Sequence, residues 1–222
     1  MPTALKIDFV SVVSCPRCVI GLAALDQALE KVKDDITAEI HFQPFELNPK
    51  MGPEGQEITE HITQKYGITA SQADANRENI RARGAALGFT FAMATDAGGG
   101  RSRIYNTFDA HRLLHWAETI SLPKQKALKE ALFTAYFTHG QSPGAHATLL
   151  AAATAAGLDA GQAQAVLSSG QYAAEVREQE QFYQSQGINS VPAVIINNKH
   201  LISGGQPPEV FEQALRKIAA GD

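Results

Sequence analysis

Strand-like sequence stands only at the two ends of this 222-residue chain, and this distribution constrains the fold more than any other feature. The segments 6–13 and 38–47 are rich in β-branched and aromatic residues, so both are predicted to be strands. Between them, apolar residues recur at three- and four-residue steps over 19–32, which predicts a helix. The first part of the chain therefore forms a βαβ unit, whose crossover we expect to be right-handed.

The strand pattern returns only near the end of the chain. A β-branched run over 191–196, an Asn197-Asn198 turn and a short strand over 199–203 predict a hairpin, and 207–219 follows as an amphipathic helix. The middle of the chain contains helical segments separated by Gly, Pro and Ser, at 71–84, 106–117, 124–138, 142–156 and 173–186. We predict two domains: residues 1–53 with 188–222, and an inserted all-helical domain over 54–187.

Composition excludes several classes of function. Hydrophobic residues make up 44% and charged residues 19%, as in folded globular proteins, and a net charge of −4 leaves no basic surplus for binding nucleic acid. No apolar run approaches the roughly 20 residues that span a bilayer. The N-terminal residues lack the basic and apolar regions of a signal peptide, so we expect a cytoplasmic protein.

The two cysteines directly follow the first predicted strand and open the first predicted helix. Helix N–H groups and the helix dipole favour a thiolate at Cys15, and the three-residue step brings Cys18 close enough to resolve a mixed disulfide. Pro16 suits the first helical turn, and Arg17 adds a permanent cation, so both are expected to favour the thiolate. The sequence therefore predicts a redox centre with Cys15 as nucleophile and Cys18 as resolving thiol.

The cysteine pair has two other interpretations, half of a zinc site and inert structural cysteines. The chain has no second cysteine pair, and its seven histidines are scattered without a tetrahedral ligand spacing. A short loop between cysteines also contributes little as a structural disulfide in a reducing compartment. We therefore expect no metal and no tightly bound cofactor.

The chain resembles the DsbA family of the thioredoxin superfamily, and within it the FrnE-like branch. The resemblance covers essentially the whole sequence and rests on the cysteine motif and on four further segments: 106–116, 135–138, Ser190-Val191-Pro192-Ala193 and Ser203-Gly204-Gly205-Gln206-Pro207. It implies an α/β thioredoxin-like fold (βαβ…ββα) with a large helical insertion, and a cis-proline at Pro192 that faces the cysteines and docks substrate backbone. FrnE-like sequences usually carry Cys-Pro-Trp-Cys, so Arg17 is a departure that bears on redox potential and substrate preference.

Three functions follow from the residues and the resemblance. The first is a thiol–disulfide oxidoreductase or isomerase acting on disulfide-containing proteins or peptides, as a monomer or homodimer. The second resembles 2-hydroxychromene-2-carboxylate isomerases and kappa-class glutathione transferases, with glutathione bound near Val191, Gly205 and Gln206; those proteins usually carry Ser where Cys15 stands. The third is a chaperone-like module with an apolar groove lined by Phe89, Phe91, Phe133, Tyr136 and Phe137, although aromatics at helical spacing are usually core.

Three smaller features are more simply explained by structure than by function. His111 and His115 share the four-residue spacing of paired metal ligands but lack an acidic partner, so we interpret them as packing residues. The glycine run 98–100 beside Arg101 and Arg103 lacks the ending of a phosphate-binding loop and is interpreted as a loop. Asp8, in the first strand, is interpreted as a solvated carboxylate rather than a proton relay.

Overall fold

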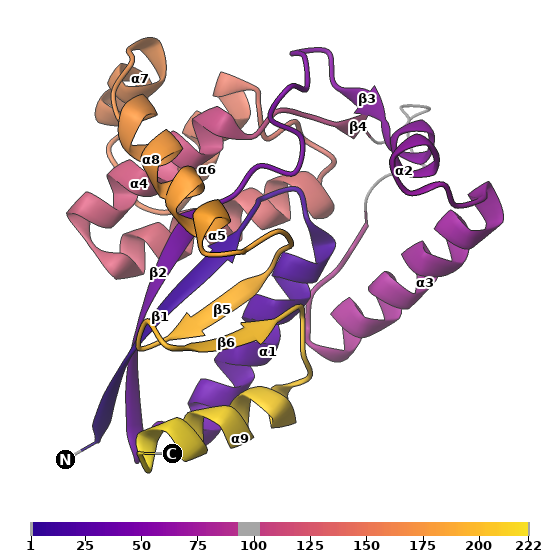
Figure 1. Ribbon diagram of the computed structural model, residues 1–222. Helices are drawn as coiled ribbons and strands as arrows, with labels where there is room; N and C mark the ends of the chain where they lie inside the picture. The colour runs from indigo at the N-terminus through magenta and orange to yellow at the C-terminus, as the bar shows by residue number, and fades with distance from the viewer. Residues whose placement is uncertain (1, 93–102, 222) are drawn as a thin grey trace.

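A mixed four-stranded sheet forms the centre of the protein (Figure 1). The computed structural model describes residues 2–92 and 103–221. The strands lie in the order β2-β1-β5-β6, with β1 and β2 parallel and the other neighbours antiparallel. The elements of this part of the chain are β1 (Thr3–Ser11), α1 (Pro16–Val32), β2 (Ile36–Pro44), β5 (Ala193–Ile196), β6 (His200–Ser203) and α9 (Pro208–Ala219).

The middle of the chain is helical, as predicted, with one exception. A two-stranded antiparallel sheet pairs Gln56 with Ile104 and Glu57 with Arg103, so the expectation of an all-helical insertion is wrong in this detail. Strands of two residues are too short to produce an alternating pattern in the sequence. The elements of the insertion are β3 (Gln56–Glu57), α2 (Ile58–Tyr66), α3 (Ala70–Ala86), β4 (Arg103–Ile104), α4 (Phe108–Ile120), α5 (Leu122–Phe137), α6 (His146–Ala155), α7 (Ala160–Ser168) and α8 (Ala173–Ser185).

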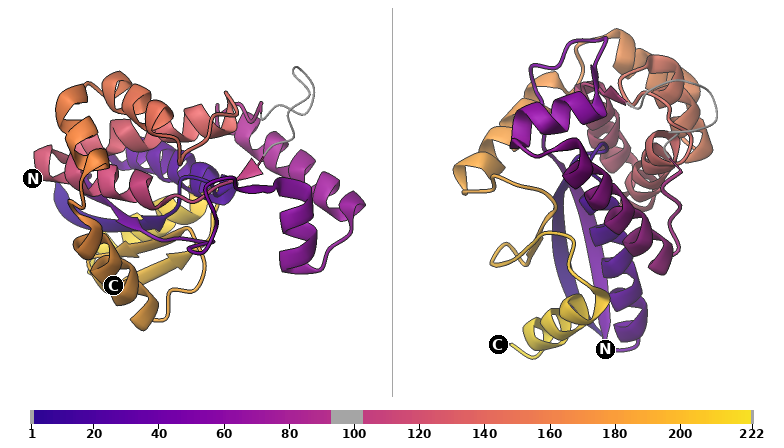
Figure 2. Two further views of the ribbon diagram at one scale, coloured as in Figure 1. Left: turned by 90° about the horizontal axis from the view of Figure 1, so that it is seen from above. Right: turned by 90° about the vertical axis from the view of Figure 1, so that its right-hand side faces the viewer.

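Helices cover both faces of the sheet (Figures 1 and 2). Helix α1 lies on one face, where α9 packs against it, and α8 lies on the opposite face. Helices α2 and α3 extend to one side of the molecule and form an arm. Helix α3 also contacts α1. A single apolar core joins the sheet, α1 and α9 to residues of the insertion, among them Phe91, Phe133, Tyr136, Phe137 and Tyr183. Four of the aromatics considered for a groove are therefore core residues, which confirms the simpler interpretation.

Helix α5 attaches the insertion to the sheet through a buried glutamine. Gln125 is completely buried, and its amide accepts a hydrogen bond from the Phe42 N–H and donates one to the Phe42 carbonyl, both at 3.0 Å. Phe42 lies in the edge strand β2, so the glutamine satisfies backbone groups that no neighbouring strand pairs. On its other side, α5 contributes Leu128 and Leu132 to a second apolar core with α4, α6 and α7.

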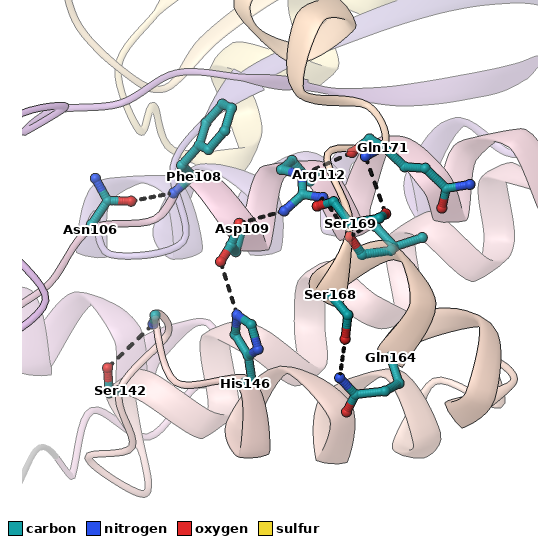
Figure 3. A network of polar contacts seen from close by, with 12 residues as sticks. Asn106, Phe108, Asp109, Arg112, Ser142, His146, Gln164, Ser168, Ser169 and Gln171 are labelled. Carbon is teal, nitrogen blue, oxygen red and sulfur yellow. Dashed lines mark hydrogen bonds and ion pairs between the residues drawn. The ribbon is translucent and has the colours of Figure 1, made fainter.

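An arginine joins α4 to the turn that separates α7 from α8 (Figure 3). The Arg112 guanidinium is buried and donates hydrogen bonds to the carbonyls of Val166, Ser169 and Gln171, and it forms an ion pair with Asp109 at 2.8 Å. The other oxygen of Asp109 contacts His146 at 3.1 Å. Because several donors of one planar group are used at once, the segment before α8 is held in a defined position.

The paired histidines are packing residues, as interpreted from the sequence. The His111 Nε2–H donates to the Phe45 carbonyl at 3.1 Å, and burial lowers the pKa of His111 to about 3. The His115 ring packs against Tyr172, with centroids 5.2 Å apart. The glycine run 98–100 and Arg101 lie outside the described residues, whereas Arg103 donates to the carbonyls of Glu54 and Gly55.

No helix within 2–92 or 103–221 is long and apolar enough to cross a membrane.

Candidate active site

The cysteine motif lies just after β1, at the start of α1. Strand β1 ends at Ser11, and Cys15 is the N-cap of α1, with Pro16 in the first helical turn. The Cys18 N–H donates to the Cys15 carbonyl at 3.0 Å, which closes the first turn around the motif. Proline is suited to this position because the first helical N–H groups have no partner within the helix. The local sequence thus places Cys15 at a helix N-terminus, as predicted.

The two thiols are free and differ in accessibility. Cys15 retains 7% of its surface exposed, whereas Cys18 is completely buried. Cys15 keeps some contact with solvent and Cys18 has none, so Cys15 is the cysteine that an external disulfide can approach. This difference supports the predicted order of events, in which Cys15 reacts first.

The surroundings of Cys15 favour its thiolate. A hydrogen bond from the Cys18 thiol is the largest cause that lowers the pKa of Cys15, and burial opposes it. The backbone N–H groups of Cys18 and Arg17 lower the pKa further, and the charge of Arg17 adds a smaller contribution. The Cys15 side chain makes no capping hydrogen bond as a thiol, and its place at the N-terminus of α1 favours the thiolate.

The surroundings of Cys18 have the opposite effect. Burial raises its pKa well above the ordinary value, and the hydrogen bond and charge of Cys15 raise it further. The charge of Lys129 and the backbone at Val12 act in the other direction. Cys18 therefore favours the thiol form, which can donate a hydrogen bond to the Cys15 sulfur.

The segment before β5 comes from the far end of the chain and faces the cysteines. The Val191–Pro192 peptide bond is cis, and the Cys15 thiol lies 3.8 Å from the Val191 carbonyl oxygen, to which it donates. A Cβ atom on Gly21 of α1 would lie 3.0 Å from the Pro192 side chain, so the proline ring packs directly on α1. Residues separated by more than 170 positions thus form one site.

The loop after β6 also reaches the motif. The Gly204 N–H donates to the Pro192 carbonyl at 2.8 Å, and a Cβ atom on Gly205 would lie 2.8 Å from the Arg17 carbonyl oxygen. Only glycine permits so close an approach of two backbone segments. Of the predicted residues, Gly205 therefore lies against the motif. Gln206 follows it, and its amide hydrogen-bonds to the Ser203 carbonyl within the same loop.

The arm formed by α2 and α3 contributes residues that the sequence analysis missed. Arg83 of α3 donates to the Gly205 carbonyl. Tyr66, the last residue of α2, is 58% exposed; partial burial raises the pKa of its hydroxyl, the charge of Cys15 raises it further, and the charge of Arg17 lowers it. Arg17 itself is exposed. No local pattern in the sequence indicated that this arm lies near the cysteines.

A buried lysine of α5 is the other residue that was missed. Lys129 is 1% exposed, and its ammonium nitrogen lies 5.1 Å from the centroid of the Phe133 ring and 6.0 Å from that of Phe42. The available signal was its position four residues after Gln125 and four before Phe133, on the apolar face of the predicted helix.

The interpretation of Asp8 as a solvated carboxylate is wrong. Asp8 is 2% exposed, accepts a hydrogen bond from Gln43 Nε2 at 2.8 Å and pairs with Lys6 at 2.8 Å. Burial raises the pKa of the Tyr183 hydroxyl of α8, and the Asp8 carboxylate raises it further. Alternation within a strand does not reveal which helix will cover a given face, and here α8 covers Asp8.

The fold and this site define a class: a thioredoxin-like protein in which a CxxC motif at a helix N-terminus faces a cis-proline, with helices inserted before that proline. The model of the DSBA-like thioredoxin domain matches residues 6–216. The chain therefore belongs to the DSBA-like thioredoxin domain family, which confirms the resemblance found in the sequence.

Solved structures agree with this assignment. A probable DsbA oxidoreductase of Streptomyces coelicolor is 32% identical, with a TM-score of 0.87 and coverage of 98% of this chain and 91% of that one. A 2-hydroxychromene-2-carboxylate isomerase is 15% identical, with a TM-score of 0.67 and 97% coverage of both chains. The cytosolic disulfide reductase DsbM of Pseudomonas aeruginosa is 12% identical, with a TM-score of 0.68 and coverage of 98% and 100%. The last two show a shared fold alone. No curated protein matches the sequence.

Proposed function

We propose that this protein is a thiol–disulfide oxidoreductase or isomerase, with Cys15 as nucleophile and Cys18 as resolving thiol. The observation that carries the proposal is the asymmetry of the pair. Cys15 keeps 7% of its residue surface exposed and has the lowered pKa, whereas Cys18 is fully buried and has the raised pKa. Disulfide exchange requires this division of roles, because the first thiol must be an accessible thiolate and the second must stay inactive until the mixed disulfide forms.

The reaction balances as two successive exchanges. The Cys15 thiolate attacks one sulfur of the substrate disulfide, the substrate S–S bond breaks, and the first substrate thiolate leaves. Cys18, once deprotonated, attacks the Cys15 sulfur and releases the second substrate thiolate. The substrate gains two electrons, and the protein ends as the Cys15–Cys18 disulfide. A dithiol or glutathione returns it to the reduced state, and the reverse sequence oxidises a substrate.

The substrate is a disulfide-containing protein or peptide, with glutathione as a further redox partner. Val191 and Pro192 lie beside the reactive sulfur, and Gly205 and Gln206 follow on the neighbouring loop. An extended peptide adding its backbone along this segment would place its disulfide over Cys15. Exposed Tyr66 and Arg17 lie near the same sulfur and offer an aromatic surface and a cation to a substrate.

The test uses a matched pair of variants, Cys18→Ser and Cys15→Ser, incubated with a cystine-bridged model peptide. Cys18→Ser is expected to accumulate a mixed disulfide through Cys15, detected by intact mass, whereas Cys15→Ser is expected to form none because Cys18 is buried. The proposal fails if Cys18→Ser traps no peptide and the wild-type protein neither reduces nor oxidises it. Glutathione-dependent turnover that survives in Cys15→Ser would instead favour the isomerase or transferase alternative.

A further inference from the structure

The loop after β6 lies between the cysteine motif and the end of α3, which contacts α1 (Figure 1). On one side of the loop, a Cβ atom on Gly205 would lie 2.8 Å from the Arg17 carbonyl oxygen, and the Gly204 N–H donates to the Pro192 carbonyl at 2.8 Å. On the other side, the Arg83 guanidinium of the last turn of α3 donates to the Gly205 carbonyl at 2.5 Å. These contacts fix the guanidinium of Arg83 at the rim of the candidate active site.

Arg83 and Arg17 are both exposed, and neither forms an ion pair with a carboxylate of the residues that the structure describes. The bond to the Gly205 carbonyl uses one of the five donors of Arg83 and does not neutralise its charge. Arg77, earlier on the same helix, differs because it pairs with Asp74 at 2.7 Å. The rim of the site therefore presents two uncompensated cations, although the whole chain has a net charge of −4.

The two cations differ in their effect on the reactive sulfur. Arg17 belongs to the cysteine motif, and its charge contributes to the lowered pKa of Cys15. Arg83 is not among the groups that shift the pKa of Cys15, although it is bonded to the loop that lies against the motif. The charge of Arg83 can therefore act on a bound substrate without changing the reactivity of the thiolate.

We propose that Arg83, assisted by Arg17, selects disulfide-containing peptides with acidic residues beside the cystine. An extended peptide rises about 3.3 Å per residue, so a residue two positions from the cystine lies about 7 Å from the reacting sulfur. A carboxylate at that position of a peptide seated along Val191 and Pro192 would reach the rim where Arg83 is held. A guanidinium can bind it through two parallel hydrogen bonds. Arg83 is a specificity-determining residue, and this selection rests on the proposed disulfide exchange.

Selection by charge has a magnitude and a salt dependence that a structural role would not produce. An exposed ion pair changes an equilibrium constant by about two- to fivefold, so the two arginines together predict a preference of about four- to twentyfold for acidic over neutral peptides. The preference is expected in KM more than in kcat, because the charges act on binding and not on the thiolate. It is expected to shrink between 0.1 M and 1 M salt, where the screening length falls from about 10 Å to about 3 Å.

The experiment measures kcat/KM for the reduction of three cystine-bridged peptides that differ only in carrying Asp, Asn or Lys two residues from each cysteine. Wild-type protein is expected to prefer the Asp peptide and to disfavour the Lys peptide. Arg83→Met is expected to lose most of the ratio between the Asp and Asn peptides without changing the pKa of Cys15, which thiolate absorbance measures, whereas Arg83→Lys keeps the cation and most of the ratio. Arg17→Met is expected to lower the ratio and also to raise the pKa of Cys15. Arg77→Met, the same change at an arginine already neutralised by Asp74, is expected to keep the wild-type ratio.

The ratio between peptides separates selection by charge from a role in holding the loop, because a displaced loop would slow all three peptides alike. Equal kcat/KM values for the three peptides with wild-type protein would refute the selection, as would an unchanged ratio in Arg83→Met or an equal loss in Arg83→Met and Arg83→Lys. Oxidised glutathione offers the same carboxylates in a small molecule. If Arg83→Met slows glutathione reduction and leaves the peptide ratio unchanged, the cation serves glutathione and the selection of acidic peptides is wrong. If wild-type protein exchanges no disulfide at all, the proposed function itself is wrong.

Discussion

Replacing Gln125 with leucine tests whether a single amide holds the helical insertion on the edge of the sheet. The side chain is completely buried; two of its hydrogen bonds go to the backbone of Phe42 in β2, and a third, at 3.4 Å, goes to the Glu118 carboxylate. In Gln125→Leu, the Phe42 N–H and carbonyl lose their hydrogen-bond partner at a buried position. An orphaned buried backbone group costs about 1–3 kcal/mol, which gives about 2–6 kcal/mol for the two.

The apolar leucine offsets part of this cost, so the expected net loss in unfolding free energy is about 2–4 kcal/mol. Urea denaturation measures it, followed by the fluorescence of Trp116, the single tryptophan, which is buried in the helical core. Gln164→Leu is the matched control, because Gln164 is exposed and bonds only to the Ser168 side chain; a change within about 0.5 kcal/mol is expected there. A loss below 1 kcal/mol for Gln125→Leu would refute the assignment of these bonds as the attachment of the insertion.

Two further predictions concern acid stability and the active-site loop. His111 has a pKa of about 3 when folded and 6.5 when exposed, so the unfolded chain binds more protons as the pH falls below 6.5 and stability decreases; at pH 5 the loss is about 2 kcal/mol. His111→Gln keeps a donor for Phe45 and is expected to remove that loss between pH 7 and 5 in urea titrations, and an unchanged pH dependence would contradict the assignment. Gly205→Ala is expected to cost about 1–3 kcal/mol and to slow disulfide exchange, because the new methyl group meets the Arg17 carbonyl. Gly170→Ala, where a methyl group meets nothing, is the control, and equal behaviour of the two variants would show that the approach is not constrained.

The sequence by itself predicted the order of elements and the residue that is proposed to react first. Hydrophobic periodicity predicted the βαβ unit, the terminal hairpin and most inserted helices, because a face that becomes buried must repeat with the period of its own helix or strand. The position of Cys15 after a strand and before a helix also predicted its role, since the N–H groups that favour its thiolate belong to Arg17 and Cys18 in the same motif. The resemblance to the DsbA family supplied Pro192, which local periodicity does not distinguish from any proline at the start of a strand.

Only the tertiary structure decided what surrounds the cysteines. Whether a side chain is buried depends on which element covers its face of the strand or helix. The local sequence around a charged residue is the same whether water or another helix covers it. Asp8 and Lys129 were therefore missed as buried groups, and each contacts an element far away along the chain, α8 for Asp8 and β2 for Lys129. Arg83 was missed because its contact with Gly205 spans 122 positions. The sequence predicts that Cys15 reacts first, whereas the burial that raises the pKa of Cys18 depends on how the folded chain packs around it.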